Sequence, residues 1–253
     1  MRRGVWALWA LLVPQMAGAA SCRDKIFEGA SYTLCEVKAG EDLRLFNQGP
    51  QGPFANFAAL ESLLAEQGKT LRFAMNAGMF DENLAAVGLY IESGIELKKL
   101  VTKDGPGNFG LLPNGVFCMT KAGDAGPAFQ ILESRRFADL RPACWMATQS
   151  GPLLVIDGAL HPNFVKFSES LNYRNGVGVA EDGRTAIFAI SNDAVNFYSF
   201  ARFFRDGLGL KWALFLDGSI SRLYAPDLNR SDLGFPIGPI VGVVEDTAGE
   251  LKE

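Results

Sequence analysis

Two polar residues stand directly after predicted apolar strands, at positions where a sheet edge can form a cleft. Asp217 follows the run 213–216, and Asn76 follows the run 71–75. Binding and catalytic side chains often lie on the loops that a rigid scaffold positions in this way. A carboxylate there can act as a general base or a nucleophile, and an amide can orient a substrate. The competing interpretation is structural, because Asp-Gly and Asn also form ordinary turns.

Two further segments carry groups that can bind a ligand. Arg174-Asn175 precedes a predicted strand, and a guanidinium suits a phosphate or a carboxylate because it forms two parallel hydrogen bonds. A surface ion pair is the alternative for Arg174. Ser150-Gly151 offers a hydroxyl group and a backbone that a ligand can approach closely. Ser150 does not lie in a G-x-S-x-G motif, so a nucleophile elbow is not indicated.

The single histidine, His161, limits the possible mechanisms. A chain with one histidine cannot build an H-E-x-x-H zinc site, and a Ser-His-Asp triad would require His161 itself. Chemistry is therefore expected to rest mostly on carboxylates, amides, hydroxyls, arginines and backbone groups, with Glu92 and Asp193 as candidates for a second carboxylate. Asp193 can instead cap a helix, and Glu92 can simply face solvent. We expect no cofactor, although Asp and Asn oxygens could hold a calcium ion without a recognisable calcium loop.

Composition indicates one large folded domain. The 253 residues are 48% hydrophobic and 21% charged, with a net charge of −4, which excludes a disordered chain. The apolar residues show no heptad repeat, which argues against a coiled coil or a solenoid. An acidic domain of this kind is a poor binder of nucleic acid.

The first 19 residues have the pattern of a signal peptide. Arg2 and Arg3 precede the apolar run 5–13, and 17–19 fits a small-x-small cleavage site. The predicted mature domain is 20–253, periplasmic or secreted, with no transmembrane segment after signal removal. A second interpretation takes 19–22 as a lipobox, which would place a lipid on Cys22.

Export permits disulfide bonds among the four cysteines. Three complete pairings are possible, and we favour Cys22 with Cys35 and Cys118 with Cys144. Two buried free thiols are the alternative for the second pair.

Two segments repeat the same order of elements. A predicted helix at 54–67, a glycine and the strand 71–75 match a helix at 196–206, a glycine and the strand 213–216. Further strands are predicted within 32–46, at 87–91, 116–120, 128–132 and 153–156, and as a hairpin of 176–179 with 186–190. These elements predict an α+β fold of mixed sheets with a few helices. Its halves would be pseudo-symmetric around a central cleft, unless the repeat arises by chance.

The ordered set of polar turns resembles the phosphodiester glycosidase domain family, in particular its bacterial exported branch. The family includes N-acetylglucosamine-1-phosphodiester alpha-N-acetylglucosaminidase. The motifs that carry the resemblance are Asn76-Ala77-Gly78-Met79-Phe80, Thr148-Gln149-Ser150-Gly151-Pro152, Arg174-Asn175-Gly176-Val177-Gly178 and Leu216-Asp217-Gly218-Ser219. The wider family tends to have Arg-Thr-Ala at 174–176 and a run of glycines after the aspartate.

The resemblance implies an exported hydrolase that cleaves a sugar-1-phosphodiester or a related envelope glycan between the anomeric carbon and the phosphate. Asp217 would act at the anomeric carbon, and Arg174 would hold the phosphate. The predicted catalytic residues are Asp217, Arg174 and Asn76, and the predicted substrate-binding residues are Gly78, Ser150, Gly151, Asn175, Gly218, Ser219, Asp193 and Glu92. Two alternatives remain, namely a non-catalytic glycan- or polymer-binding envelope protein and an unrelated hydrolase that uses Ser150 or Ser219.

Overall fold

The computed structural model describes residues 20–121, 123–217 and 220–247, and these form three main antiparallel sheets. The first sheet has the order β1 (Ser21–Phe27), β2 (Ala30–Lys38), β15 (Thr185–Ser191), β14 (Asn175–Val179), β16 (Trp212–Asp217), β12 (Leu153–Ile156) and β13 (Ala159–Leu160). The second sheet has the order β10 (Phe129–Glu133), β9 (Gly115–Met119), β11 (Met146–Ser150), β7 (Tyr90–Glu92) and β8 (Ile95–Lys98).

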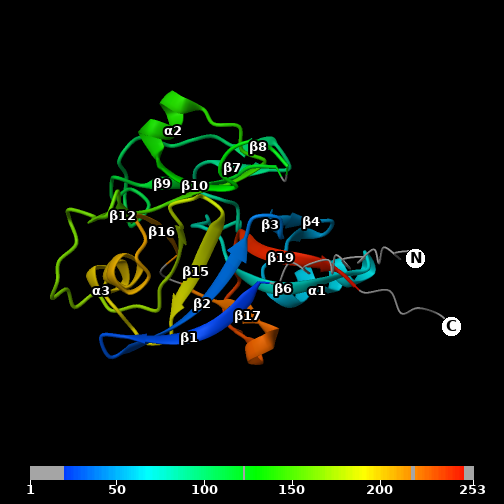
Figure 1. Cartoon of the computed structure of the whole chain (residues 1–253). Coiled ribbons are helices and arrows are strands. Elements are labelled where there is room, and N and C mark those ends of the chain that lie inside the picture. Colours follow the sequence, from blue (N-terminus) through cyan, green and yellow to red (C-terminus); the bar gives the residue numbers. More distant parts are fainter. Residues whose placement is uncertain (1–19, 122, 218–219, 248–253) are drawn as a thin grey trace, which may run out of the picture.

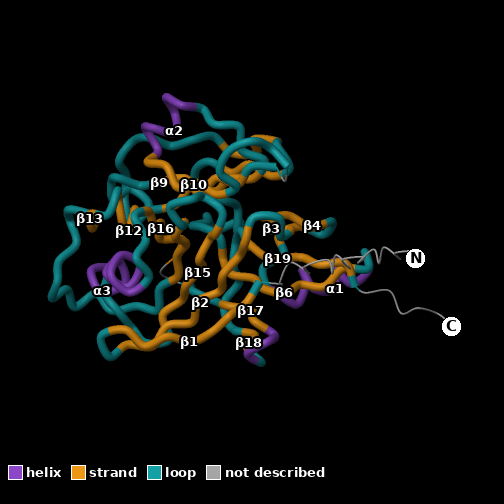
Figure 2. The backbone as a smooth tube through the Cα atoms, viewed as in Figure 1, coloured by secondary structure: helices purple, strands orange, loops and turns teal. Residues whose placement is uncertain are grey.

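The third sheet has the order β18 (Arg230–Ser231), β17 (Leu223–Ala225), β6 (Lys69–Asn76), β19 (Ile240–Asp246) and β3 (Asp42–Phe46). A short ribbon pairs β4 (Gln48–Gly49) with β5 (Gly52–Pro53). Figure 2 shows the strands through the middle of the molecule and the helices toward its edges.

The inner faces of the three sheets share one apolar core. Phe188 of β15, Phe117 of β9 and Phe73 of β6 meet there, each from a different sheet. The ring of Phe188 lies 5.2 Å from that of Phe73 and 5.7 Å from that of Phe117. Because truncating a buried phenylalanine costs about 3–5 kcal/mol, these contacts fix the sheets relative to one another.

Each sheet carries a helix on its outer face (Figure 1). The helices are α1 (Phe57–Glu66) on the third sheet, α2 (Ser134–Leu140) on the second and α3 (Phe197–Arg202) on the first. A π-helical turn, Phe203–Gly207, continues α3, and a 3₁₀ turn, Pro226–Leu228, follows β17.

Side chains at helical spacing explain why α1 forms. Phe57, Leu60 and Leu64 are buried at intervals of three and four residues, which is the apolar stripe of an amphipathic helix. Asn56 caps the helix, because its side chain accepts a hydrogen bond from the Ala59 N–H at 2.9 Å. The predicted helix at 54–67 is therefore shorter in the structure, and its residues 54–56 form the approach to the cap.

The α+β class is confirmed, with two differences in detail. The strand pairings in the described sheets are antiparallel, whereas mixed sheets were predicted. The repeated unit also occurs three times instead of twice. Each helix is followed by a residue of positive φ and then by a strand, and the connecting residues are Gly68 (φ 68°), Arg141 (φ 45°) and Gly209 (φ 70°).

The predicted disulfide pairing is confirmed. Cys22 and Cys35 lie directly opposite each other in β1 and β2 and are bonded, and Cys118 of β9 is bonded to Cys144. The alternative of two free thiols is therefore wrong. The lipid alternative is also wrong, because the sulfur atom of Cys22 is used in a disulfide.

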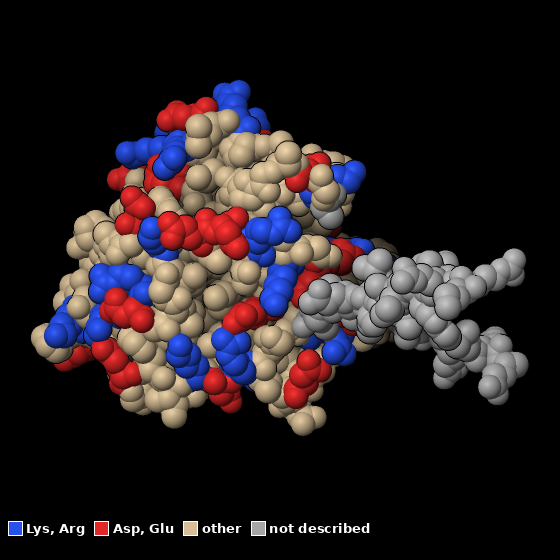
Figure 3. All heavy atoms as spheres, viewed as in Figure 1, with Lys and Arg blue, Asp and Glu red and all other residues tan. Residues whose placement is uncertain are grey.

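The predicted signal peptide lies outside the described residues. In the part of the chain that the structure does describe, no helix is long and apolar enough to cross a membrane. Figure 3 shows acidic and basic side chains interspersed over the visible face.

Candidate functional site

The three repeated units all end at the same place, and each ends in a predicted site residue. β6 ends at Asn76, β11 at Ser150 and β16 at Asp217. The hydroxyl group of Ser150 donates a hydrogen bond to the carbonyl of Leu216 at 2.7 Å, which ties the end of β11 to β16.

Asn175 joins the other two strand ends. It begins β14 directly opposite Asp217, and its Oδ1 accepts the backbone N–H of Asp217 at 2.9 Å. Its Nδ2 donates to the backbone oxygen and to Oδ1 of Asn76, at 2.8 and 3.1 Å. We call Asn76, Asn175 and Asp217 the amide cluster. The structure thus brings three predicted site residues into one hydrogen-bonded group.

The two amides of this cluster also fix the backbone after Asp217. The Nδ2 of Asn76 donates to the Ile220 carbonyl at 2.6 Å, and its Oδ1 accepts the Arg222 N–H at 3.0 Å. The Ser221 hydroxyl donates to Asn175 Oδ1 at 3.3 Å. Both amides are fully buried, so their role is to position the chain around Asp217. Direct contact with a substrate was predicted for them.

A β-bulge orients the end of β16. Asn175 pairs with Asp217 and Gly176 pairs with Phe215, so Leu216 is the extra residue. Bulges occur next to active sites, where they redirect a side chain. Asp217 itself is 6% exposed, at the edge of the buried interior. The predicted substrate-binding residues Gly218 and Ser219 lie outside the described residues.

Ser150 is not placed as a nucleophile. Its side chain is fully buried, and its hydroxyl is engaged with the Leu216 carbonyl. A serine-hydrolase mechanism through this residue would need a substrate to enter the interior. Its role in the structure is to hold two strand ends together.

The glycines beside these strand ends allow close packing. A Cβ atom at Gly151 would lie 2.5 Å from the Cβ of Asn114, and one at Gly78 would lie 2.9 Å from the Thr148 hydroxyl oxygen. Thr148 in turn donates to the Ala77 carbonyl at 2.9 Å. Both positions therefore need glycine for packing within the fold. The sequence predicted contact with a substrate at both glycines.

Arg174 has a different environment from the one predicted for a phosphate-binding residue. It is 1% exposed, and its Nε and Nη2 donate to the carbonyls of Val195 and Ser170 at 2.8 and 3.0 Å. The guanidinium stacks over Phe197 at 3.7 Å from the ring centre. Burial lowers the pKa of Arg174 to about 10. This arginine fastens the loop before β14 to the loop before α3.

The two candidates for a second carboxylate lie away from the amide cluster. Ile91 pairs with Ala147 in β11, so Glu92 lies four residue positions from Ser150, or about 13 Å along the strand. Burial raises the pKa of Glu92 above its ordinary value. Asp193 is exposed and accepts the Ser31 N–H at 2.8 Å, while Asn196 caps α3. Neither therefore supplies a second carboxylate beside Asp217.

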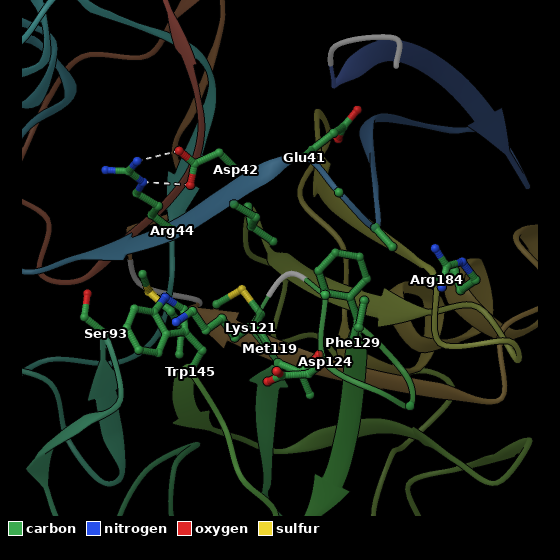
Figure 4. Close-up of a pocket in the computed structure, with 18 residues that line it drawn as sticks. Glu41, Asp42, Arg44, Ser93, Met119, Lys121, Asp124, Phe129, Trp145 and Arg184 are labelled. Carbon is green, nitrogen blue, oxygen red and sulfur yellow. Dashed lines mark hydrogen bonds and ion pairs between the residues drawn. The ribbon is translucent and has the colours of Figure 1, made fainter. Parts of the chain in front are cut away.

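A pocket with a different lining lies elsewhere. Its volume is about 690 Å³, and Met119 lies in its wall (Figure 4). Met146 also lines it and pairs with Met119, at the end of β11 that is distant from Ser150. Its charges are mixed, with Asp42 and Arg44 paired at its edge. This pocket is separate from the strand ends that the motifs occupy.

Two arginines beside the amide cluster were missed in the sequence. Arg222 and Arg230 line a smaller cavity of about 310 Å³ that also contains Ser221. Arg222 follows Asp217 by five residues, and this proximity in sequence was the one available signal. Of the described residues, no group of three or more His, Cys, Asp or Glu is arranged to hold a metal ion.

Comparisons with known proteins agree with this architecture. Over 171 residues the chain is 37% identical to the uncharacterized protein YigE of Escherichia coli. The aligned segment covers 66% of this chain and 64% of that protein. The chain therefore spans slightly less than two thirds of the length of that relative.

Two solved structures share the fold. The catalytic domain of zebrafish N-acetylglucosamine-1-phosphodiester alpha-N-acetylglucosaminidase has a TM-score of 0.60 at 15% identity, covering 89% of this chain and 82% of that one. A hypothetical protein from Synechocystis has a TM-score of 0.58 at 16% identity, covering 89% and 61%.

The sequence profile of the phosphodiester glycosidases matches residues 69–244, which contain the amide cluster, the strand of the first helix–strand unit and the whole of the other two units. The resemblance to the family is thus confirmed, whereas the assignment to a bacterial exported branch stays a prediction, and the chain belongs to the phosphodiester glycosidase family.

Proposed function

We propose that this protein is an exported hydrolase that cleaves a sugar-1-phosphodiester, or a related cell-envelope glycan, between the anomeric carbon and the phosphate. One observation carries the proposal, namely the amide cluster that holds Asp217 where three strands end. Family membership supports the reaction type. The name of the zebrafish protein describes action on such a diester.

Asp217 is the carboxylate assigned to the anomeric carbon. If the configuration is retained, Asp217 attacks the carbon and water then releases the sugar; if it is inverted, Asp217 takes a proton from the attacking water. In both cases the bond between the carbon and the bridging oxygen breaks, and its electron pair leaves on the phosphate. The products are the free sugar and a phosphate monoester.

A phosphate leaving group explains how one carboxylate can suffice. The oxygen of an alcohol leaving group must receive a proton, whereas a phosphate monoester is stable as an anion with a second pKa near 6. The site therefore needs no general acid in the position that Glu92 or Asp193 was predicted to fill. It also needs no contribution from His161.

Export to the periplasm or beyond is supported by the two disulfide bonds, since such bonds persist in oxidising compartments. The signal-peptide pattern of the first 19 residues agrees with this location. The proposed partner is a carbohydrate or sugar phosphate, and no nucleic acid is involved.

The test is a screen of alkyl diesters of sugar-1-phosphates, with the monoester product followed by ³¹P NMR and the anomer of the sugar by ¹H NMR. Asp217→Asn should lower turnover by at least about 1000-fold, because the group at the anomeric carbon is lost. Asp193→Asn is the matched control, since this exposed carboxylate lies outside the amide cluster, and its turnover should be unchanged.

Undiminished turnover in folded Asp217→Asn would rule out the role assigned to Asp217. Binding of the diesters by the wild type without any hydrolysis would instead favour the alternative of a non-catalytic glycan-binding protein.

A further inference from the structure

The smaller cavity beside the amide cluster has the properties of an anion site. We call it the arginine pocket, and the residues of its wall that matter here are Tyr173, Ser221, Arg222, Arg230, Asp232 and Leu233. Its volume of about 310 Å³ is ample for a phosphate group and part of a substituent.

Of the two arginines, Arg230 already has a carboxylate partner within the protein. Arg230 donates from Nε and Nη2 to the two carboxylate oxygens of Asp232, both at 2.9 Å. Its Nη1 donates to Asn192 Oδ1 at 2.7 Å and to the Thr33 hydroxyl at 3.0 Å. All three nitrogens of Arg230 are thus engaged within the protein.

Arg222 has no such arrangement. It is only 6% exposed, and its guanidinium makes no hydrogen bond or ion pair with any residue that the structure describes. Its Nη2 lies against Gly234, where a Cβ atom would come within 2.6 Å. Burial lowers the pKa of Arg222, and the charge of Asp232 opposes this. A nearly buried cation without a hydrogen-bonded anion is costly, and a bound anion would remove that cost.

The charge of the pocket matches one particular class of anion. Arg222 and Arg230 carry two positive charges, and Asp232 carries one negative charge, so one positive charge is left. A phosphodiester carries one negative charge. Its non-bridging oxygens accept the paired hydrogen bonds that a guanidinium donates.

The pocket is connected directly to the proposed catalytic residue. Ser221, which lines the pocket, donates hydrogen bonds to Asn175 Oδ1 at 3.3 Å and to the Asp217 carbonyl at 3.1 Å. The backbone N–H of Arg222 is held by Asn76. The amide cluster therefore fixes the pocket and Asp217 as one unit.

We propose that the arginine pocket is the phosphate subsite of the enzyme and that the guanidinium of Arg222 binds the non-bridging oxygens of the substrate diester. This assignment rests on the function proposed above. As the bond to the anomeric carbon breaks, the phosphate gains a second negative charge, and Arg222 stabilises that charge. The electron pair stays on the released monoester, and water supplies the hydroxyl group and proton that complete the products.

The experiment compares wild type, Arg222→Gln and Arg222→Lys, with Arg184→Gln as a matched control because Arg184 is exposed and lines the separate large pocket. Three quantities are measured: kcat/KM for a sugar-1-phosphodiester, inhibition by inorganic phosphate, and turnover of an uncharged aryl glycoside of the same sugar. Thermal protection by dimethyl phosphate reports binding independently of activity.

We expect Arg222→Gln to lower kcat/KM for the diester by about 10- to 100-fold and to weaken phosphate inhibition and dimethyl phosphate protection by a similar factor. Turnover of the uncharged glycoside should be unchanged, and Arg222→Lys should restore part of the loss. Arg184→Gln should behave as wild type. The uncharged substrate separates loss of anion binding from loss of the fold.

The two proposals can fail separately. If Asp217→Asn abolishes turnover while Arg222→Gln leaves the kcat/KM for the diester and the protection by dimethyl phosphate unchanged, the phosphate subsite is overturned and the proposed function stands. An equal loss on the charged and uncharged substrates would also overturn the subsite. If dimethyl phosphate protects the wild type through Arg222 but no diester is hydrolysed, the anion site stands and the proposed reaction fails.

Discussion

The strongest test of the amide cluster is Asn175→Ala, which removes the side chain that joins the three strand ends. The substitution deletes four hydrogen bonds, to the Asn76 carbonyl, to Asn76 Oδ1, from the Asp217 N–H and from the Ser221 hydroxyl. Three of these are fully buried, at 2.8, 3.1 and 2.9 Å. At about 1 to 1.5 kcal/mol for each buried bond, the free energy of unfolding should fall by about 3–4 kcal/mol.

That loss is a large part of the stability of a domain, which is typically about 5–15 kcal/mol. For a domain of this size it corresponds to a fall in Tm of about 6–16 °C. Urea unfolding and a thermal scan measure the two values. Asn172→Ala is the matched control, because the Asn172 side chain makes one long, exposed hydrogen bond of 3.5 Å to Ser170 in the same loop.

Activity gives the second measurement. Asn175→Ala should lose turnover at temperatures where it remains folded, because the Asp217 backbone has lost its fixed partner. The argument that this amide positions the site would be refuted by a variant that keeps full turnover and whose free energy of unfolding lies within about 1 kcal/mol of the wild-type value.

Three further predictions concern other parts of the molecule. Replacing both Cys22 and Cys35 with serine should lower the free energy of unfolding by about 3 kcal/mol in urea under oxidising conditions, since the bond closes a loop of 13 residues in sequence separation; a change below about 1 kcal/mol would contradict this. Burial raises the pKa of Glu92 above 4.5, so the folded state holds the proton more strongly and stability falls as the pH rises through the raised pKa. Glu92→Gln should therefore be more stable than wild type at pH 7 and similar to it below pH 4, and identical pH profiles of urea unfolding would be inconsistent with that origin. Burial lowers the pKa of His161 below 6.5, so stability should fall as the pH decreases through 6.5. His161→Asn should lose this slope and keep its turnover, and a loss of turnover in the folded variant would show that histidine takes part in the reaction.

The apolar periodicity of the sequence predicted most of the scaffold. The strands at 71–75, 116–120, 128–132, 153–156 and 213–216 and the hairpin within 176–190 all occur in the structure. β11, Met146–Ser150, gave no such pattern, because its five buried residues include Thr148, Gln149 and Ser150. Side chains and backbone partners satisfy these polar groups inside the protein, and such partners cannot be recognised in a single sequence.

The site was predictable in position but only partly in role. Polar residues at the ends of predicted strands could be located from the sequence, and Asn76 and Asp217, which follow strands, do meet Asn175, which begins one. The sequence could not show whether Arg174 or Arg222 is the arginine that faces a cavity and could bind a phosphate. Arg174 packs on Phe197 of α3, whereas Arg222 lines a cavity. The residue types that flank each arginine in the sequence do not reveal this difference.

The three repeated units explain why polar residues converge in a protein with so apolar an interior. In each unit the helix covers the outer face of its sheet, and the strand that follows has one face toward this helix and the other toward the common core. Both faces of that strand are therefore buried, so polar side chains are tolerated chiefly at its end. Because the three strands β6, β11 and β16 end at one point, the fold itself gathers Asn76, Ser150 and Asp217 there. Asn76 hydrogen-bonds to the segment after β16 and Ser150 to β16 itself, and Asp217 is the carboxylate of the three, to which we assign the proposed chemistry.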